Sequence, residues 1–347
     1  MRHPVSRPRM RALAVGLALA ASVLVPSGSV GAADQYEWAA LGDSYTAGGF
    51  VGDPQPPLGD PSRDGCDRTT NAYPDVVDRE LAEFPPGKPV NLTNVSCGNA
   101  TIADIANEKQ KPISPVEPPA DGWPAVDPQI QRARLGDGTD VVTVGVGGNS
   151  LPFGGILLKC LEQGAVGKNC RDFYTNPPEG EESIQDKLAR VQDEYIEMLA
   201  KVHQAAPNAK VITVGYPAVL PETGSECNRL SLTELGPINH ADIDWLREDV
   251  LKPLNSTIKR VTDFFGDRYT DVYSSSIGHD ACQPADTKWV EGLCGTAADY
   301  WPKSLPGTLL NCGLIGKRVT LVHPNAAGYA NTAAHVERAI RIALLER

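Results

Sequence analysis

The sequence predicts an α/β protein, a three-layer α/β/α sandwich with a mostly parallel central sheet. Short apolar runs typical of buried strands alternate with segments whose apolar residues recur at helical spacing. Because a crossover helix between consecutive strands leaves them parallel, this alternation favours a parallel sheet between two helical layers. The sequence has no internal repeat and no clean linker, so we expect one domain.

Five runs are expected to form the strands of the sheet. They lie in the ranges 36–42, 89–95, 140–146, 210–216 and 268–273, and the last is the weakest.

Three helices are predicted from apolar spacing. Ser183 is a suitable N-cap for a helix over 184–202. A second helix is expected over 243–265, where Pro253 should kink or interrupt it. The third runs from Ala326 to the C-terminus. Long loops lie between these elements, and we expect the loops 49–67 and 151–170 to shape a binding pocket.

The first 33 residues have the pattern of a secretory signal. Four arginines between Arg2 and Arg11 precede the apolar run 12–25, and small residues follow at 30–33. The run is shorter than the ~20 residues that a membrane span requires. We therefore expect cleavage near residue 33, with residues 34–347 exported as a single extracellular domain without stable membrane insertion.

The chain is acidic, with a formal net charge of -11 at pH 7, and loss of the four signal arginines makes it more so. Because an acidic protein has no electrostatic attraction to a polyanion, we expect no nucleic-acid partner. We also expect a monomer.

The eight cysteines all follow the predicted signal. An even number in an exported chain, without C-x-x-C spacing, favours disulfides over a zinc site. The residues concerned are Cys66, Cys97, Cys160, Cys170, Cys227, Cys282, Cys294 and Cys312. Their spacing alone leaves the pairing open.

The segment Gly42-Asp43-Ser44-Tyr45 directly follows the first predicted strand. Binding sites in open parallel sheets collect at the carboxyl ends of strands. A serine that begins a helix there exposes its hydroxyl and leaves its N–H free to bind an anion. The alternative is an ordinary Asp/Ser helix cap.

A serine nucleophile needs a base, and His323 is the best placed of the six histidines. It lies in Val322-His323-Pro324-Asn325, a loop that leads into the last helix, where the proline makes the approach rigid. The alternative is a surface or cap histidine.

Two further turns follow predicted strands. Gly148-Asn149 follows the third strand, and the Asn149 amide could donate to an oxyanion. Cys97-Gly98-Asn99 follows the second strand and offers backbone N–H donors. Each alone is typical of a simple turn, but four such elements in one chain indicate a catalytic edge.

The order of these motifs, from GDSY through GGN to HPNxxG, resembles the SGNH hydrolase superfamily, also called GDSL esterases and lipases. The resemblance extends from Leu41 to the final helix and is closest to secreted actinobacterial lipases and esterases. It implies the flavodoxin-like fold of SGNH hydrolases, with Ser44 as nucleophile and His323 as base. It also implies an oxyanion hole formed by the N–H of Ser44, a backbone N–H of Gly98 or Asn99, and the Asn149 side chain.

The same resemblance implies the disulfide pairs Cys66–Cys97, Cys160–Cys170 and Cys227–Cys282, which leaves Cys294–Cys312 as a fourth.

Three positions depart from the family pattern. Family members often have Asp where this chain has Thr320, so the backbone carbonyl of Thr320 is expected to orient His323 in a Ser–His dyad. Ser150 replaces an Asp that often follows the Asn of the third motif. The family glycine of the second motif falls at Asn99, so either Gly98 or Asn99 supplies the N–H.

We therefore expect a secreted serine hydrolase of carboxylic esters, with acyl lipids as substrates, that acts through an acyl-enzyme without cofactor or metal. Its activity should fall below roughly pH 6–7 unless the surroundings shift the pKa of His323. The alternatives are a carbohydrate O-deacetylase on the same fold and a catalytically silent lipid- or polymer-binding protein. The natural substrate and its acyl chain length stay open.

Overall fold

The structure, a computed structural model, describes residues 35–49, 51–297 and 300–346. The predicted secretory signal lies outside the described residues. From Gln35 onward the chain forms one compact unit.

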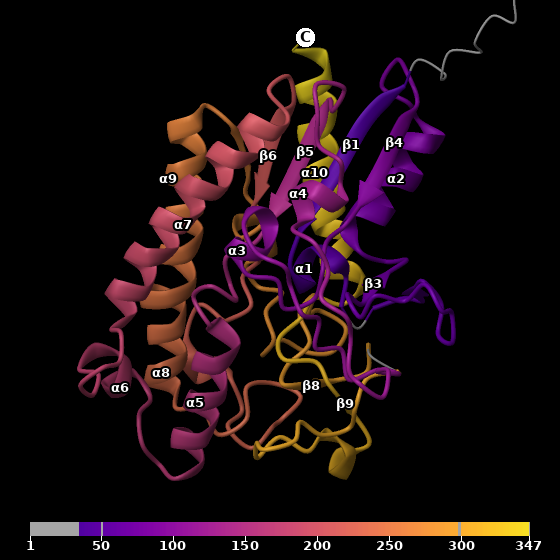
Figure 1. Cartoon of the computed structure of the whole chain (residues 1–347). Helices are drawn as coiled ribbons and strands as arrows, with labels where there is room; N and C mark the ends of the chain where they lie inside the picture. The colour runs from indigo at the N-terminus through magenta and orange to yellow at the C-terminus, as the bar shows by residue number, and fades with distance from the viewer. Residues whose placement is uncertain (1–34, 50, 298–299, 347) are drawn as a thin grey trace, which may run out of the picture. The chain divides into compact units, whose positions relative to one another are not determined.

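In the described part of the chain, five parallel strands form the central sheet in the order β4-β1-β5-β6-β7 (Figure 1). They are β1 (Tyr36–Gly42), β4 (Val90–Asn94), β5 (Val141–Gly145), β6 (Lys210–Val214) and β7 (Arg268–Thr270). All five predicted strands are present, and several end a few residues earlier than expected. The predicted α/β class is therefore confirmed, with every strand of this sheet parallel.

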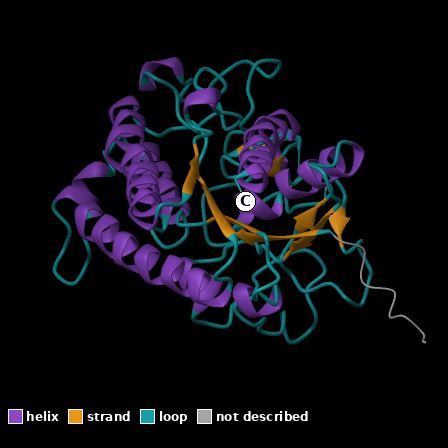
Figure 2. Ribbon diagram, turned by 90° about the horizontal axis from the view of Figure 1, so that it is seen from above, coloured by secondary structure: helices purple, strands orange, loops and turns teal. Residues whose placement is uncertain are grey.

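Helices cover both faces of the sheet (Figure 2). On one face α2 (Tyr73–Glu83) packs against α10 (Ala326–Leu345), and on the other α7 (Ile184–Ala205) packs against α3 (Ile102–Ala106) and α9 (Lys252–Phe265). The side chains of β1 alternate between the two layers. Trp38 and Ala40 pack in the cluster with α2 and α10, whereas Ala39 and Leu41 pack in the opposite cluster.

Shorter elements lie in the connections. They are α1 (Ser44–Ala47), β2 (Pro54–Gln55), β3 (Arg68–Thr69), α4 (Gln129–Arg132), α5 (Phe153–Ala165), α6 (Arg171–Thr175), α8 (His240–Trp245), β8 (Cys294–Gly295) and β9 (Arg318–Val319). Three 3-10 turns cover Gly224–Glu226, Ser274–Ser276 and Cys312–Ile315.

The helix predicted over 243–265 is interrupted, as Pro253 suggested. It starts earlier, as α8, and passes through a π-helical segment at Leu246–Leu251 before α9 begins at Lys252. Pro253 lies in the first turn of α9, where a missing N–H costs no helical hydrogen bond. The proline therefore marks the point where one helical segment changes into the next.

The expectation of a loop over 151–170 was wrong, because most of this segment is helix α5. Ile156, Leu157, Cys160 and Leu161 are buried at helical spacing, which stabilises a helix despite the glycines in its first turn. Helix α2 was not predicted; it has a proline in its first turn and buries Val77 and Leu81.

Disulfides tie the long connections to the scaffold. The structure pairs Cys66 with Cys97, Cys160 with Cys170, Cys227 with Cys282, and Cys294 with Cys312, the same pairs that the resemblance implied. No helix in the described ranges is long and apolar enough to cross a membrane.

Candidate active site

The predicted site residues meet at the carboxyl edge of the sheet. The end of β1 lies between its two neighbours, with Asp43 N–H donating to Gly145 O at 3.0 Å and Cys97 N–H donating to Gly42 O at 3.0 Å. A Cβ on Gly42 would lie 2.4 Å from the Gly145 oxygen, and Gly42 has a φ of 155°. Only glycine therefore allows the strands to approach this closely where the Ser44 turn begins.

Ser44 is the first residue of α1, and Asp43 caps that helix by accepting the Tyr45 N–H at 2.9 Å. The Ser44 hydroxyl lies 2.7 Å from Nε2 of His323, although the two residues are 279 positions apart in sequence. The turn after β1 and the loop before α10 thus bring a hydroxyl and an imidazole into hydrogen-bond contact.

The other imidazole nitrogen of His323 contacts backbone. Nδ1 lies 2.8 Å from the carbonyl oxygen of Thr320 and 3.1 Å from that of Leu321. Because a carbonyl oxygen can only accept, Nδ1 carries the proton in the neutral ring and Nε2 is left to accept from Ser44.

The backbone before His323 has an unusual conformation. Leu321 and Val322 have positive φ angles of 45° and 56°, which are costly for a β-branched residue such as valine. Hydrogen bonds hold this conformation: Val322 N–H donates to Gly292 O at 2.9 Å, and the Tyr45 hydroxyl donates to Val322 O at 2.7 Å. The Tyr45 ring also lies 4.8 Å from the imidazole ring, centroid to centroid.

Burial lowers the pKa of His323 to about 4, and its hydrogen bonds to the Thr320 and Leu321 carbonyls only partly offset this. The imidazole is therefore neutral, and able to accept a proton, at all pH values well above 4.

Asp43 joins the Ser44 turn to the turn after β5. Its carboxylate is buried and accepts a hydrogen bond from the Tyr216 hydroxyl, which in turn accepts the Gly148 N–H at 2.7 Å. Burial raises the pKa of Asp43 to about 7. Tyr216 thereby bridges the segments that carry Ser44 and Asn149.

Asn149 is held by its own side chain, whose Nδ2 donates to Ala100 O at 2.9 Å. An amide NH₂ has two N–H donors, so one is left available on the cavity side. Ser150, which departs from the family pattern, accepts the Ile102 N–H at 2.9 Å at the start of α3.

The structure distinguishes the two candidate donors in the turn after β4. Gly98 N–H donates to Cys66 O at 2.8 Å and is therefore engaged. Asn99 has a φ of 63°, a left-handed conformation that glycine adopts freely and that asparagine tolerates, which fits the glycine that the resemblance implies at this position. Across the described residues, no hydrogen bond engages the N–H of Asn99.

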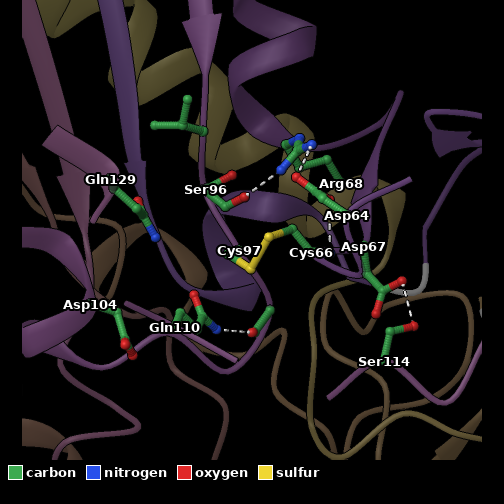
Figure 3. The surroundings of a disulfide bond; sticks show 12 residues. Asp64, Cys66, Asp67, Arg68, Ser96, Cys97, Asp104, Gln110, Ser114 and Gln129 are labelled. Atoms are coloured by element: carbon green, nitrogen blue, oxygen red, sulfur yellow. Dashed lines mark hydrogen bonds and ion pairs between the residues drawn. A yellow bond between two sulfur atoms is a disulfide. The ribbon is translucent and has the colours of Figure 1, made fainter. Parts of the chain in front are cut away.

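The disulfide Cys66–Cys97 and Gln110 hold this turn in place (Figure 3). Nε2 of Gln110 donates to Gly98 O at 2.7 Å. Near the disulfide, Arg68 and Arg132 both pair with Asp64, at 2.8 and 2.9 Å. The turn is therefore anchored by a covalent bond, by hydrogen bonds and by a partly buried charge cluster.

Comparison with known proteins identifies the family of the chain. The model of the GDSL-like Lipase/Acylhydrolase family matches residues 40–330. The chain belongs to this family. The predicted resemblance is thereby confirmed, and this GDSL protein is a carboxylic ester hydrolase.

Two relatives of this GDSL hydrolase are similar over most of their length. Lipase 2 of Streptomyces coelicolor is 30% identical over 329 residues, which cover 93% of this chain and 91% of the relative. An esterase of Streptomyces scabiei is 28% identical over 349 residues, covering 94% and 92% of the two chains.

The solved structure of phospholipase A1 from Streptomyces albidoflavus NA297 has a similar fold. It superposes with a TM-score of 0.53 at 21% identity, covering 91% of this chain and 99% of that one. At this level of identity the similarity establishes the fold of the GDSL hydrolase alone.

A cavity of about 630 Å³ opens at the edge where Ser44, Asn99, Asn149 and His323 meet in this GDSL hydrolase. Apart from Asp67 and Ser114 its remaining lining is largely apolar. It comes from the segments around Asp67, Ser114 and Val219, from α5, from the π-helical segment and α9, and from the C-terminal loops. The apolar side chains include Phe153, Val219, Leu251, Leu254, Leu305, Val319 and Leu321. The segment 151–170 does therefore help to shape the pocket, although through a helix.

The contacts of Tyr45 and Tyr216 in this GDSL hydrolase were not predicted from the sequence. Tyr45 belongs to the motif that was singled out, but only the fold brings it against His323. Tyr216 was counted in a strand, whereas β6 ends at Val214 and leaves Tyr216 at the carboxyl edge. A polar residue just after a parallel strand is the signal that could have identified it.

Proposed function

We propose that this GDSL hydrolase is a secreted lipase or esterase that cleaves acyl lipid esters through a Ser44–His323 dyad and an acyl-enzyme. The observation that carries the proposal is the 2.7 Å contact of Ser44 Oγ with His323 Nε2 in the lining of a largely apolar cavity. The fixed Nδ1–H tautomer supports it, because it makes Nε2 the acceptor.

In the first step His323 Nε2 takes the proton of Ser44 as the Ser44 oxygen attacks the ester carbonyl carbon. The carbonyl oxygen becomes an oxyanion, which accepts hydrogen bonds from the N–H groups of Ser44 and Asn99 and from the Asn149 side chain. The tetrahedral intermediate then collapses, the bond to the alcohol oxygen breaks, and the imidazolium gives its proton to the leaving alcohol.

In the second step a water molecule attacks the acyl-enzyme while His323 takes one of its protons. The same donors bind the second oxyanion. Collapse releases the carboxylic acid, and the proton on His323 returns to Ser44. In this cycle the carbonyls of Thr320 and Leu321 face the imidazolium and stabilise its charge in place of a carboxylate.

The cavity favours acyl lipids over acetylated sugars. An acetyl group fills a small fraction of about 630 Å³, whereas a fatty acyl chain gains by burying its methylene groups against Leu251, Leu254 and Phe153. The O-deacetylase and the silent binding protein stay as the competing functions. The contact between Ser44 and His323 argues against the second, because binding alone does not need it.

Secretion and the monomeric state are parts of the same proposal. The N-terminal signal pattern and the disulfides support export, since disulfides persist in oxidising compartments. A Streptomyces rimosus structure similar to this one, with a TM-score of 0.50, is itself described as an extracellular lipase. The acidic net charge supports the absence of a nucleic-acid partner.

The test is hydrolysis of p-nitrophenyl esters from acetyl to palmitoyl, beside acetylated xylan, by the wild type and by Ser44→Ala. We expect turnover that rises from acetyl to medium or long chains and is abolished in Ser44→Ala. Ser225→Ala, an exposed serine on a 3-10 turn, is the matched control and should behave as the wild type. A preference for acetylated xylan supports the deacetylase, and no turnover of any ester by the wild type contradicts the enzyme.

A further inference from the structure

One wall of the cavity is polar, in contrast to the apolar lining elsewhere. It is formed by Asp67 and Ser114 beside Gly98 and Asn99. Asp67 directly follows Cys66, whose disulfide partner Cys97 precedes the Asn99 turn, so the carboxylate lies next to the anchor of that turn (Figure 3). The mechanism above uses neither Asp67 nor Ser114.

Asp67 is a buried carboxylate with one oxygen engaged. It is 7% exposed, and its Oδ1 accepts the Ser114 hydroxyl at 2.9 Å and lies 3.5 Å from Arg63. Within the described residues, no hydrogen bond or ion pair uses Oδ2. Oδ2 is not among the fully buried atoms that lack a partner, so it keeps accessible surface, and Asp67 lines the cavity. This oxygen can therefore accept a hydrogen bond from a ligand in the cavity.

The wall is held rigidly before any ligand binds. Ser114 Oγ also accepts the Val116 N–H at 3.1 Å, and Ser114 O accepts from Trp123 Nε1 at 2.9 Å. The Trp123 ring packs so closely on Gly65 that a Cβ there would lie 2.5 Å from it. The carboxylate and the hydroxyl therefore keep their positions as a preformed pair.

The charges around this wall favour a neutral ligand with hydroxyl groups over a cation. A carboxylate only accepts hydrogen bonds, and the Ser114 hydroxyl, whose proton goes to Asp67, has remaining acceptor capacity. Burial raises the pKa of Asp67 to about 6, which leaves it mostly ionised at neutral pH. Arg63 lies against Asp67, however, so the wall has little net negative charge to attract a cation.

We propose that Asp67 and Ser114 form the subsite for the alcohol part of the ester, and that this alcohol carries a free hydroxyl, as in a glycerol ester. The inference rests on the proposed ester hydrolysis and adds the class of leaving group. The acyl chain lies against the apolar walls, the carbonyl oxygen lies at the Asn99 turn, and the alcohol lies beyond that turn, where its hydroxyl donates to Asp67 Oδ2.

The experiment compares two esters of the same acid, 1-decanoylglycerol and methyl decanoate, with decanoylcholine as a third substrate. In the wild type, kcat/KM should be higher for the glycerol ester than for the methyl ester. Asp67→Asn should lower the glycerol-to-methyl ratio of kcat/KM by about tenfold or more, the usual effect of losing a hydrogen bond to a charged group. The change should appear mainly in KM.

Ser114→Ala should lower the same ratio and serves as the test if Asp67→Asn does not fold. Asp121→Asn, an exposed aspartate outside the cavity, is the matched control and should leave the ratio unchanged. The proposed subsite would be overturned if the glycerol-to-methyl ratio of kcat/KM stayed unchanged, whether or not both values fell equally. It would also be overturned if kcat/KM fell for decanoylcholine alone. Failure of the wild type on all esters would instead refute the proposed function, so the two failures are distinguishable.

Discussion

His323 Nδ1 donates to the carbonyl oxygen of Thr320 across 2.8 Å, so a backbone group occupies the place where a carboxylate often stands in this family. The Thr320 side chain points elsewhere, because its hydroxyl donates to Gly292 O at 2.8 Å. The same residue thus orients the imidazole with its backbone and stabilises the neighbouring strand connection with its side chain.

Thr320→Val should reduce stability more than activity. It removes the buried bond to Gly292 O, a loss of about 1 kcal/mol, although Val322 N–H still donates to that oxygen. The backbone carbonyl is unchanged, so kcat/KM should fall less than threefold, as checked by thermal unfolding and ester hydrolysis. Thr320→Asp places a carboxylate against the Gly292 oxygen and should be less stable without being faster. A hundredfold loss of activity in Thr320→Val would show that the side chain orients His323.

The acid limb of the pH profile should lie near pH 4, well below the range expected from the sequence. The proposed mechanism needs the neutral imidazole, and burial lowers the pKa of His323 to about 4, so the basic form predominates from about pH 5 upward. The measurement is kcat/KM from pH 3 to 9 on a non-ionising ester, restricted to pH values where the protein stays folded. A midpoint at pH 6–7 would mean that His323 is more solvated than its surroundings indicate.

Tyr216→Phe should lower kcat, because it removes the hydroxyl that joins Asp43 to the Gly148 N–H. Two buried polar groups lose a partner, which should cost about 1–3 kcal/mol of stability, and kcat should fall about tenfold as Asn149 loses its support. Tyr195→Phe is the matched control. Its hydroxyl is buried without a hydrogen-bond partner in the described structure, so its removal should affect neither stability nor rate. Equal behaviour of the two variants would argue against the bridge.

Asn149→Ala should lower kcat by about 10²–10³ with a small change in KM, as expected for a donor that acts on the oxyanion.

Asn99→Gly should keep kcat within about threefold of the wild type, because glycine keeps the backbone N–H and readily adopts the φ of 63°. Asn99→Ala keeps the N–H but should lose about 1 kcal/mol of stability in the left-handed conformation. If Asn99→Gly is inactive, the side chain of Asn99 takes part in the reaction.

The local sequence pattern was sufficient to predict the strands of the central sheet and some of the helices. The strand at 36–42 and the helix that Ser183 caps begin where their residues predict, since alternation, apolar spacing and a capping box are local properties. Helix α5 was missed because the glycines in its first turn and the preceding Pro152 are typical of loops, and only packing in the core overrides that preference.

The sequence by itself determined the fold class and the family and indicated the side chains that we propose as catalytic, because the motifs that follow parallel strands meet at one edge of the sheet. The tertiary structure decided what surrounds those side chains. Four features depend on segments that are far apart in the chain. They are the left-handed backbone at Leu321 and Val322, the burial that lowers the pKa of His323, the Tyr216 bridge and the polar wall at Asp67. Local pattern cannot encode these, because burial and long-range hydrogen bonds exist only once the loops have packed.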